Sequence, residues 1–374
     1  MVSSSDAQPL QPNKILPNLE PPSSADTLRP EPRGLFDGPL DRSQLNLKDR
    51  SVLRVADLSP KQVIEICRLA AALEAVEIGD FHVLDGKIVI TAFFEASTRT
   101  RTSFESSVLR LDGKIISIPE GQMTGAKKGE SLSDIGEMFN AYGDVVVLRH
   151  TDTESLDEIQ KNLRIPLINA GNGSGEHPTQ ALADWYALLK WRPELASEDL
   201  PRDQRLHLGI LGTPGSMRAV KSFLYMSLLF SHAIRKVTVI SEMADPFGTD
   251  VEDRIRAAGV DFEVSNDIQG HLGDLDVIYM NSIAFLGDSY KSLDARYKLD
   301  ADSPLKKDAV ILHPLARLDE LDTSLDETRH NLYFSQAHGA VFIRQALLAA
   351  VLDRLDRLPG HWFEEQPGSS AETS

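Results

Sequence analysis

The chain has 374 residues and a formal net charge of −17 at pH 7, so its length favours two domains and its charge argues against nucleic acid or an anionic membrane as the main partner. No apolar run is long enough to span a bilayer, and the N-terminus lacks the apolar core of a secretory signal. The single cysteine, Cys67, excludes an intrachain disulfide and a cysteine-based metal cluster, and together these features predict a cytoplasmic protein.

Both ends of the chain have the composition of unfolded segments. Residues 1–42 contain eight of the twenty prolines, with serine, glutamine and asparagine between them. Residues 359–374 are polar and carry glycine and serine. Such segments bury too little apolar surface to offset the entropy of ordering the chain. We therefore expect a disordered tail at each end.

The first folded elements are predicted to be a helix and a buried strand. A helix starts favourably at Ser59-Pro60 and keeps its apolar pattern to about Ile78. The β-branched run at residues 87–92 predicts a parallel strand that is buried on both faces. Behind it, residues 102–111 have the spacing of a helix whose apolar face carries Phe104, Val108 and Leu111.

The segment between this strand and helix, residues 93–105, has the features of an anion site. Free backbone N–H groups and the positive end of the helix dipole lie at the strand-to-helix turn. The turn adds the hydroxyls of Ser97, Thr98 and Thr100 and the guanidinium of Arg99. A capped helix with surface arginines is the alternative interpretation. Two arginines and three hydroxyls within five positions favour a phosphate site.

Residues 93–105 resemble the phosphate-binding signature of the aspartate and ornithine carbamoyltransferases, with the Phe-Phe-Glu-Ala lead-in of the aspartate branch. The resemblance continues, motif by motif and in chain order, from about residue 46 to residue 356. It implies two doubly wound α/β domains with parallel sheets and an active site in the cleft between them. It also implies that carbamoyl phosphate donates its carbamoyl group to an amino acid, without a metal or organic cofactor.

A polar loop with two lysines follows the next short strand, which is predicted at residues 114–118. Lysines in such a loop are usually solvated, and their spacing does not fit a P-loop. In the family this loop reaches into the active site of a neighbouring subunit, and Thr124 and Lys128 match its phosphate-contacting positions. The resemblance therefore implies a homotrimer with shared active sites.

Two further strands are predicted to bring side chains to the same edge of the first sheet. The strand at residues 144–148 is followed directly by Arg149. The strand at residues 166–169 leads through a glycine-rich loop to the start of a helix that carries His177 and Gln180. An arginine there could simply be a cap, and a lone histidine is weak evidence. The resemblance assigns Arg149 and His177 to the carbamoyl oxygen and Gln180 to the carbamoyl amine. Attack on the carbonyl builds charge on that oxygen, so these donors would stabilise the transition state.

Residues 193–205 form a polar linker, and an alternation of predicted strands and helices restarts after it. Residues 206–211 and 236–240 are predicted strands, and a glycine-bearing turn between them precedes an apolar helix. A dinucleotide-binding unit is a competing interpretation, but the close Gly-x-Gly pair of its fingerprint is missing. The resemblance assigns Arg218 to the carboxylate of the accepting amino acid, whereas a helix-surface arginine is the alternative.

The next strand, residues 276–280, leads into the segment that departs most from the family. Ser282 stands where aspartate carbamoyltransferases have an acceptor-binding arginine, and Ala284 stands where they have a glutamine. A serine cannot replace the charged, bidentate fork of arginine. The ornithine pattern is not restored either. These two acceptor-site positions predict a less basic pocket than aspartate requires.

The last strand, residues 309–312, precedes His-Pro-Leu-Ala-Arg at positions 313–317. The family has proline at the fourth position, after a cis bond, and its leucine carbonyl contacts the carbamoyl amine. Leu315 matches that leucine, and Ala316 removes the residue that makes a cis bond inexpensive. A long helix over residues 339–355 is expected to pack back onto the first domain.

The sequence thus predicts a disordered tail (residues 1–42), a carbamoyl-phosphate domain (43–192), an acceptor domain (193–338), a returning helix (339–358) and a second tail (359–374). The implied catalytic residues are Arg99, Thr100, Arg149 and His177. L-Aspartate carbamoylation in pyrimidine biosynthesis is the leading hypothesis. Carbamoylation of another amine, such as a diamino acid, is the alternative that Ser282 and Ala284 favour. A non-catalytic scaffold is the third, and the intact phosphate set weighs against it.

Overall fold

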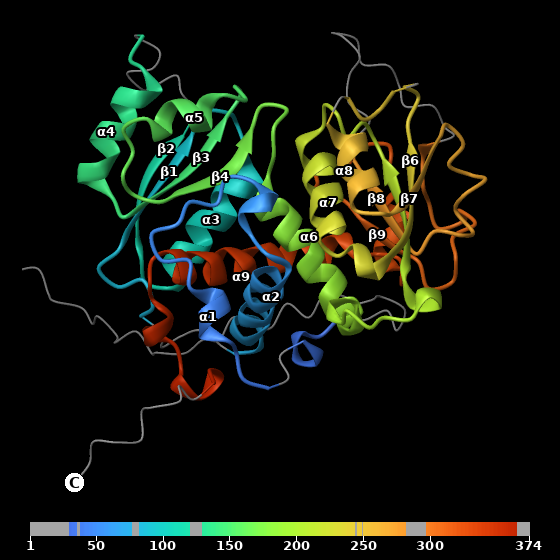
Figure 1. The fold of residues 1–374 in the computed structure, drawn as a ribbon, viewed down its shortest axis with the longest axis horizontal. Coiled ribbons are helices and arrows are strands. Elements are labelled where there is room, and N and C mark those ends of the chain that lie inside the picture. Colours follow the sequence, from blue (N-terminus) through green and yellow to red (C-terminus); the bar gives the residue numbers. More distant parts are fainter. Residues whose placement is uncertain are drawn as a thin grey trace, which may run out of the picture.

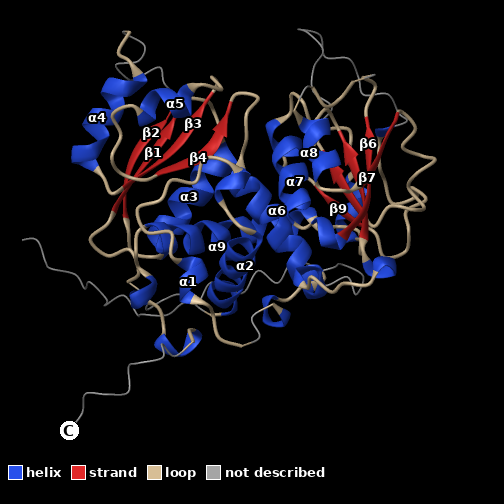
Figure 2. Ribbon diagram, in the orientation of Figure 1, coloured by secondary structure: helices blue, strands red, loops and turns tan. Residues whose placement is uncertain are grey.

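The computed structural model describes residues 30–35, 38–76, 82–119, 129–243, 245–248, 250–281 and 297–364. Two parallel sheets, each with its own helices, lie side by side in Figure 1. Three longer helices run between and beneath them: α2 (Pro60–Ala75), α6 (Pro178–Trp191) and α9 (Tyr333–Val351). Figure 2 shows the same division, with the strands in two separate groups. The fold is therefore the pair of parallel α/β domains that the sequence predicts.

The first sheet has the strand order β2-β1-β3-β4, and all of its pairings are parallel. Its strands are β1 (Ile88–Phe93), β2 (Lys114–Pro119), β3 (Val145–His150) and β4 (Leu167–Asn172). All of them were predicted, with ends that shift by one to three residues at most. β1 is nearly continuously buried because helices cover both faces of the sheet. β2 lies at the edge and is largely exposed.

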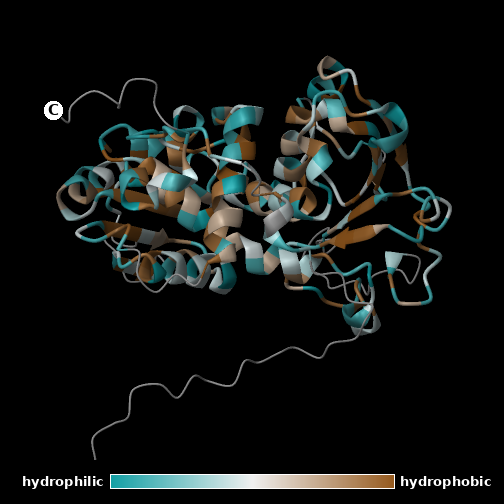
Figure 3. Cartoon of the chain, turned by 90° about the horizontal axis from the view of Figure 1, so that it is seen from below, coloured by the Kyte–Doolittle hydropathy of each residue, from teal (hydrophilic) through white to brown (hydrophobic). Residues whose placement is uncertain are grey.

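The second sheet has the order β7-β6-β5-β8-β9, again entirely parallel. Its strands are β5 (Leu206–Leu211), β6 (Ile234–Ile240), β7 (Asp261–Ser265), β8 (Val277–Met280) and β9 (Val310–Leu312). The sequence analysis missed β7, which is a short edge strand with a polar face, preceded by the short helix α8 (Val251–Ala257). In Figure 3 the hydrophobic colours gather on the strands and on the inward helix faces.

The remaining α-helices of the described residues connect these strands. They are α1 (Arg42–Leu45), α3 (Thr98–Arg110), α4 (Leu132–Tyr142), α5 (Ser155–Gln160) and α7 (Arg218–Leu229). The predicted face of α3 is correct, because Phe104 and Val108 are fully buried. Met138 of α4 is 45% exposed although it lies next to a buried face of that helix. Ile135, Gly136 and Phe139 form the buried face, and Met138 lies beside it on the solvent edge.

Two helices begin earlier than the sequence indicates. α3 starts at Thr98 rather than Thr102, because Ser97 is extended and ends the preceding loop. The hydroxyl- and arginine-rich segment is therefore the first turn of the helix itself. α9 starts at Tyr333 rather than Gly339, and it packs against α2, α3 and α6. No helix of the described residues is long and apolar enough to cross a membrane.

The two chain ends pack against each other where tails were predicted. Leu40 is fully buried, and its N–H donates to the carbonyl of Trp362 at 2.7 Å. Trp362 and Phe363 are each 5% exposed, and Arg42 lies over the Phe363 ring at 3.8 Å. The predicted tails therefore extend too far into the chain, because these apolar side chains gain more by burial than their polar neighbours suggest. Residues 1–29 and 365–374 lie outside the described part.

Candidate active site

A cavity of about 550 Å³ lies between the two halves, at the carboxyl ends of the strands. This is the edge at which open parallel sheets bind ligands. Its lining comes from the ends of β3, β4 and β8, from the starts of α3, α6 and α7, from the turn after β9 and from α9. It includes these residues that the sequence predicted for the site: Ser97, Arg99, Thr100, Arg149, His177, Gln180, Arg218 and Leu315.

The other predicted site residues are placed differently. Thr98 is the first residue of α3, but its side chain is exposed and it does not line the cavity. Its carbonyl accepts a hydrogen bond from the Thr102 hydroxyl at 2.7 Å. Thr124, Lys128, Ser282 and Ala284 lie outside the described residues.

The start of α3 provides the anion-binding end of the cavity. The first intrahelical bond of its entry turn joins the Arg101 N–H to the Ser97 carbonyl, so the N–H groups of the preceding turn have no helical acceptor. The Ser97 hydroxyl does not cap them. Thr100 is 8% exposed, and burial lowers the pKa of Arg99, which remains a cation. Free donors, a hydroxyl and a guanidinium thus face one space, as a phosphate requires.

Glu95 joins two arginines that come from opposite halves of the molecule. Its Oε1 accepts from Nη2 of Arg149 at 2.8 Å, and its Oε2 accepts from Nη1 of Arg218 at 2.9 Å. Burial lowers the pKa of Arg149 to about 10, with a further contribution from Arg218 and an opposing one from Glu95. The pKa of Glu95 is lowered, because these two cations outweigh the effect of its burial. The carboxylate therefore keeps two like charges together at the cavity wall.

His177 presents a neutral imidazole to the cavity. Burial, together with the nearby Arg149 and Arg218, holds its pKa well below the usual range. Its Nδ1 lies 3.3 Å from the Thr179 hydroxyl, and its buried Nε2 contacts no hydrogen-bond partner among the described residues. If the hydroxyl donates to Nδ1, the hydrogen of the ring is on Nε2. The histidine is then a neutral donor with a free N–H.

The turn after β9 contains a cis peptide bond between Leu315 and Ala316, the possibility that the sequence left open. The side chain of His313 holds this turn. Its Nδ1 accepts from the Leu315 N–H at 2.8 Å, and its Nε2 donates to Glu320 at 2.9 Å.

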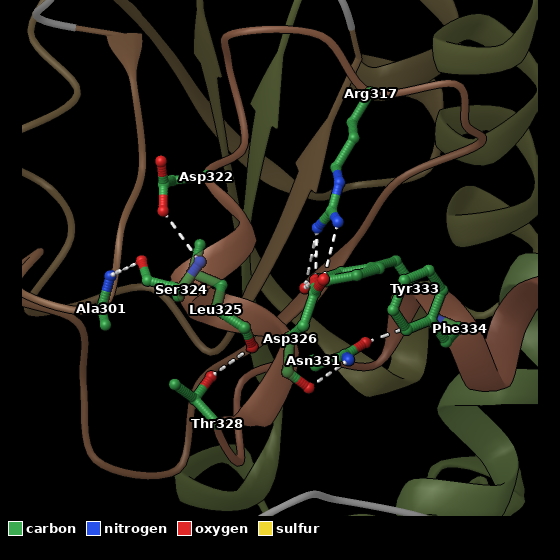
Figure 4. Close-up of polar contacts among 10 residues, drawn as sticks. All are labelled: Ala301, Arg317, Asp322, Ser324, Leu325, Asp326, Thr328, Asn331, Tyr333 and Phe334. Atoms are coloured by element: carbon green, nitrogen blue, oxygen red, sulfur yellow. Dashed lines mark hydrogen bonds and ion pairs between the residues drawn. The ribbon is translucent and has the colours of Figure 1, made fainter. Parts of the chain in front are cut away.

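Arg317, the last residue of the His-Pro-Leu-Ala-Arg segment, does not line the cavity. Figure 4 shows its guanidinium paired with the Asp326 carboxylate, with the second contact at 2.6 Å. Asp326 also accepts from the Tyr333 hydroxyl at 2.6 Å, at the first residue of α9. Arg317 therefore anchors the start of α9 instead of contacting a ligand.

Sequence reasoning missed several residues of the cavity. Gln336 and Arg344 both come from α9, and each is almost completely buried. Burial lowers the pKa of Arg344 to about 9, and its Nη1 donates to the Ser103 hydroxyl. The available signal was an arginine and two glutamines within an otherwise apolar helix. A charged residue on such a face is rarely buried without a purpose.

The geometry suits the attack of a neutral amine on a carbonyl group next to a phosphate. Thr100, Arg149 and His177 are donors that line the same cavity as the α3 anion site. They would stabilise charge that develops on the carbonyl oxygen without giving up a proton. The described residues contain no cluster of side chains that would hold a metal ion.

Two family models match the chain, and together they cover most of it. Residues 50–190 match the carbamoyl-phosphate-binding domain of the aspartate/ornithine carbamoyltransferases. Residues 204–351 match the aspartate/ornithine-binding domain of the same family.

Curated relatives and solved structures agree with these models. The aspartate carbamoyltransferase catalytic subunit of Methanopyrus kandleri is 33% identical over 312 residues, which are 81% of this chain and 97% of the relative. The chloroplastic aspartate carbamoyltransferase of Oryza sativa subsp. japonica is 32% identical, covering 82% of this chain and 86% of the relative. Aspartate transcarbamoylase from Trypanosoma cruzi, solved with carbamoyl aspartate and phosphate, is 29% identical with a TM-score of 0.72, covering 84% of this chain and 98% of that one.

Proposed function

This chain belongs to the aspartate/ornithine carbamoyltransferase family, and from that membership we propose that it transfers the carbamoyl group of carbamoyl phosphate to the amino group of L-aspartate. The observation that carries the proposal is the convergence of Thr100, Arg149 and His177 on the cavity that the start of α3 supplies with anion donors. The relatives add the acceptor, because those described above are named for aspartate. The product, N-carbamoyl-L-aspartate, would enter pyrimidine biosynthesis.

In the proposed reaction the phosphate group of carbamoyl phosphate lies at the start of α3, beside Arg99. The unprotonated amine attacks the carbonyl carbon, and the C–N bond forms as the carbonyl electrons move to oxygen. Arg149, His177 and Thr100 donate to this oxyanion. The oxyanion then re-forms the carbonyl as the C–O bond to phosphate breaks, and the phosphate that leaves with the bonding electrons takes up the proton that the amine loses. Positioning and electrostatics supply the rate, because no side chain is needed as a nucleophile.

The test of the acceptor is ureido-product formation from carbamoyl phosphate. L-Aspartate would be compared with ornithine, putrescine and diaminopropionate at equal concentrations. We expect turnover with aspartate. Activity with another amine and none with aspartate would instead support the alternative that Ser282 and Ala284 suggest. Binding of carbamoyl phosphate without turnover on any amine would support the non-catalytic scaffold.

We propose that the protein is a homotrimer whose active sites are shared between subunits. Support comes from the sequence match of Thr124 and Lys128 and from apolar side chains left exposed on the first half, including Leu109 and Met138, which are 64% and 45% exposed. Light scattering of the purified protein would measure its mass. Coexpression of inactive Arg99→Ala and Lys128→Ala chains should restore activity, because some sites would combine two intact halves. Persistent inactivity of the mixture would contradict shared sites.

We also propose that the protein acts in the cytoplasm. Support comes from Cys67, which is buried and unpaired, as is usual in reducing compartments. Cell fractionation with enzymatic detection would test the proposal, and recovery in an organelle fraction would contradict it.

A further inference from the structure

Asp184 lies directly behind the cavity, one helical turn after Gln180 on α6. Its side chain is completely buried. Its Oδ1 accepts two hydrogen bonds, from Nε2 of Gln180 at 2.7 Å and from Nε2 of Gln336 at 2.6 Å. The buried Tyr279 hydroxyl lies close enough to this carboxylate to lower its pKa. One carboxylate oxygen thus holds the amide groups of two residues that line the cavity.

This contact decides which end of the Gln180 amide faces a substrate. An ionised carboxylate has no hydrogen to donate, so the amide must turn its nitrogen toward Asp184 and its oxygen away. Protonation would not reverse this arrangement, because Oδ1 already accepts two hydrogen bonds and a proton on the other oxygen leaves Oδ1 an acceptor. In carbamoyl phosphate the carbamoyl nitrogen carries the only N–H donors. An inward amide oxygen on Gln180 can accept from that nitrogen, whereas an inward amide nitrogen would repel it.

The second amide extends the same arrangement to the other half of the molecule. Because Gln336 also turns its nitrogen toward Asp184, its oxygen is free to accept the His313 N–H at 2.9 Å. His313 in turn holds the Leu315 N–H at 2.8 Å. A continuous set of hydrogen bonds therefore runs from Gln180 through Asp184 to the turn that carries Leu315 at the opposite cavity wall.

Burial of the Asp184 carboxylate lowers the stability of the folded protein, so a purely structural role does not explain this residue. Burial raises its pKa to about 7, although the two glutamines, Tyr279 and Arg344 act in the opposite direction. Burial and the neighbouring Asp184 together raise the pKa of the buried Tyr279 hydroxyl well above its usual range. An apolar residue of similar size would avoid this desolvation cost if the two glutamines were also apolar. The carboxylate is thus explained by what it orients.

We propose that Asp184 is a positioning residue, which fixes the amide of Gln180 with its oxygen toward the carbamoyl nitrogen and, through Gln336, holds the turn at residues 313–315 in register with it. This role rests on the proposed function, since it assumes that carbamoyl phosphate occupies the cavity. Asp184 itself touches no reacting atom. It would govern recognition of the carbamoyl group and leave the phosphate site at the start of α3 unaffected.

Two variants of similar size separate this role from a general effect of charge or packing. Asp184→Leu and Asp184→Asn both remove the negative charge, but only leucine removes the acceptor oxygen. Calorimetry would measure the Kd of carbamoyl phosphate and the Kd of inorganic phosphate for each purified variant. In Asp184→Leu we expect the Kd of carbamoyl phosphate to rise tenfold or more, roughly the effect of one lost buried hydrogen bond, while that of phosphate changes less than about twofold. Asp184→Asn should keep both values near those of the unaltered protein.

The possible results are separable. If the Kd of carbamoyl phosphate divided by the Kd of phosphate is the same in Asp184→Leu and the unaltered protein, the positioning role is wrong. If both variants lose the same affinity for carbamoyl phosphate, the charge of Asp184 alone matters and the positioning role is again wrong. If Asp184→Leu does not fold, the double variant Asp184→Leu/Gln336→Leu would be used, because it also removes one of the two amides that lose their acceptor. The same two Kd values would be measured for it. If the unaltered protein fails to bind carbamoyl phosphate, the proposed function itself is wrong. If it binds and reacts normally while the ratio stays constant in Asp184→Leu, only the positioning role fails.

Discussion

Single residues in the cavity are set to particular protonation and hydrogen-bonding states by burial. His177 remains neutral because its imidazole is 4% exposed and lies near Arg149 and Arg218. A neutral donor does not lose its hydrogen to the leaving group, so it can stabilise an oxyanion throughout the reaction. Asp184 and Arg344 show the same principle with opposite signs, because burial raises the pKa of the acid and lowers that of the base.

Removal of the His177 side chain should lower kcat for carbamoyl transfer by about 10²- to 10³-fold, the usual effect of losing one oxyanion donor. Steady-state kinetics of His177→Ala would measure it. The matched control is His207→Ala, which removes another buried histidine, hydrogen-bonded to Thr238 in the second sheet and remote from the cavity lining. That control should lose stability without a comparable loss of kcat. A His177→Ala enzyme with nearly full kcat would contradict the assigned role.

Replacement of Asp184 by asparagine should stabilise the protein at high pH. The pKa of this carboxyl is about 7 in the folded protein and near 3.8 in the unfolded chain, so between these values the folded state binds more protons. The free energy of unfolding therefore falls as pH rises through this window, and the penalty is complete above pH 7. Urea denaturation should show Asp184→Asn to be more stable than the unaltered protein at pH 8, with a smaller advantage at pH 5. If the gain in stability of Asp184→Asn does not change with pH, the raised pKa of Asp184 is contradicted.

At the scale of elements, the composition of the cavity depends on the residue at which each helix begins. α3 supplies anion donors because it begins at Thr98, inside the motif, and α9 reaches the cavity because it begins at Tyr333. The pairing of Arg317 with Asp326 fixes that second start (Figure 4). The bridge between Leu40 and Phe363 brings these two side chains into the same hydrophobic cluster as those of α2 and α9.

Trp362 should be a stabilising residue that does not affect catalysis. It is 5% exposed and does not line the cavity, so Trp362→Ala should lower the free energy of unfolding by about 3–5 kcal/mol. Denaturant titration would measure this change, and KM for both substrates should stay within about twofold. The neighbouring His361 is exposed, which makes His361→Ala the control for a local change without lost burial. Equal stabilities of the two variants would show that the chain ends contribute little.

At the scale of the whole molecule, one carboxylate connects the two halves across the cavity. Glu95 follows β1 of the first sheet, and its partner Arg218 begins α7 of the second half. The bridge is partly buried, so it keeps more of its Coulomb energy than an exposed pair would. It therefore holds Arg149 and Arg218, which line the cavity from the two halves, next to each other.

Glu95→Gln should weaken this connection and expose Arg149 to the unshielded charge of Arg218. We expect kcat to fall and KM for the amino-acid acceptor to rise, each by about tenfold, as for the loss of one charge-assisted contact. Small-angle scattering should show a slightly larger radius of gyration. The matched control is Glu74→Gln, which alters a partly buried acid paired with Lys190 within the first half. Unchanged kinetics in Glu95→Gln would mean that the two walls are held by other contacts.

Much of the fold could be predicted because it is encoded locally. Buried parallel strands are continuous apolar runs, and helices repeat their apolar residues every three or four positions, so β1, β5 and the face of α3 were evident. The short, half-polar β7 lacked such a pattern and was missed. The phosphate signature was equally local, because all of its donors fall in one turn.

The sequence by itself therefore determined the two parallel-sheet domains, the family and most of the polar residues that line the cavity at the strand ends. Only the tertiary structure decided how these residues are held. Glu95 and Arg218 are 123 positions apart, Asp184 and Gln336 are 152 apart, and Ser103 and Arg344 are 241 apart. No local pattern specifies such pairs, because they depend on how the two halves and α9 pack together. Burial then sets the charge states of His177 and Asp184, and burial is a property of the folded chain alone.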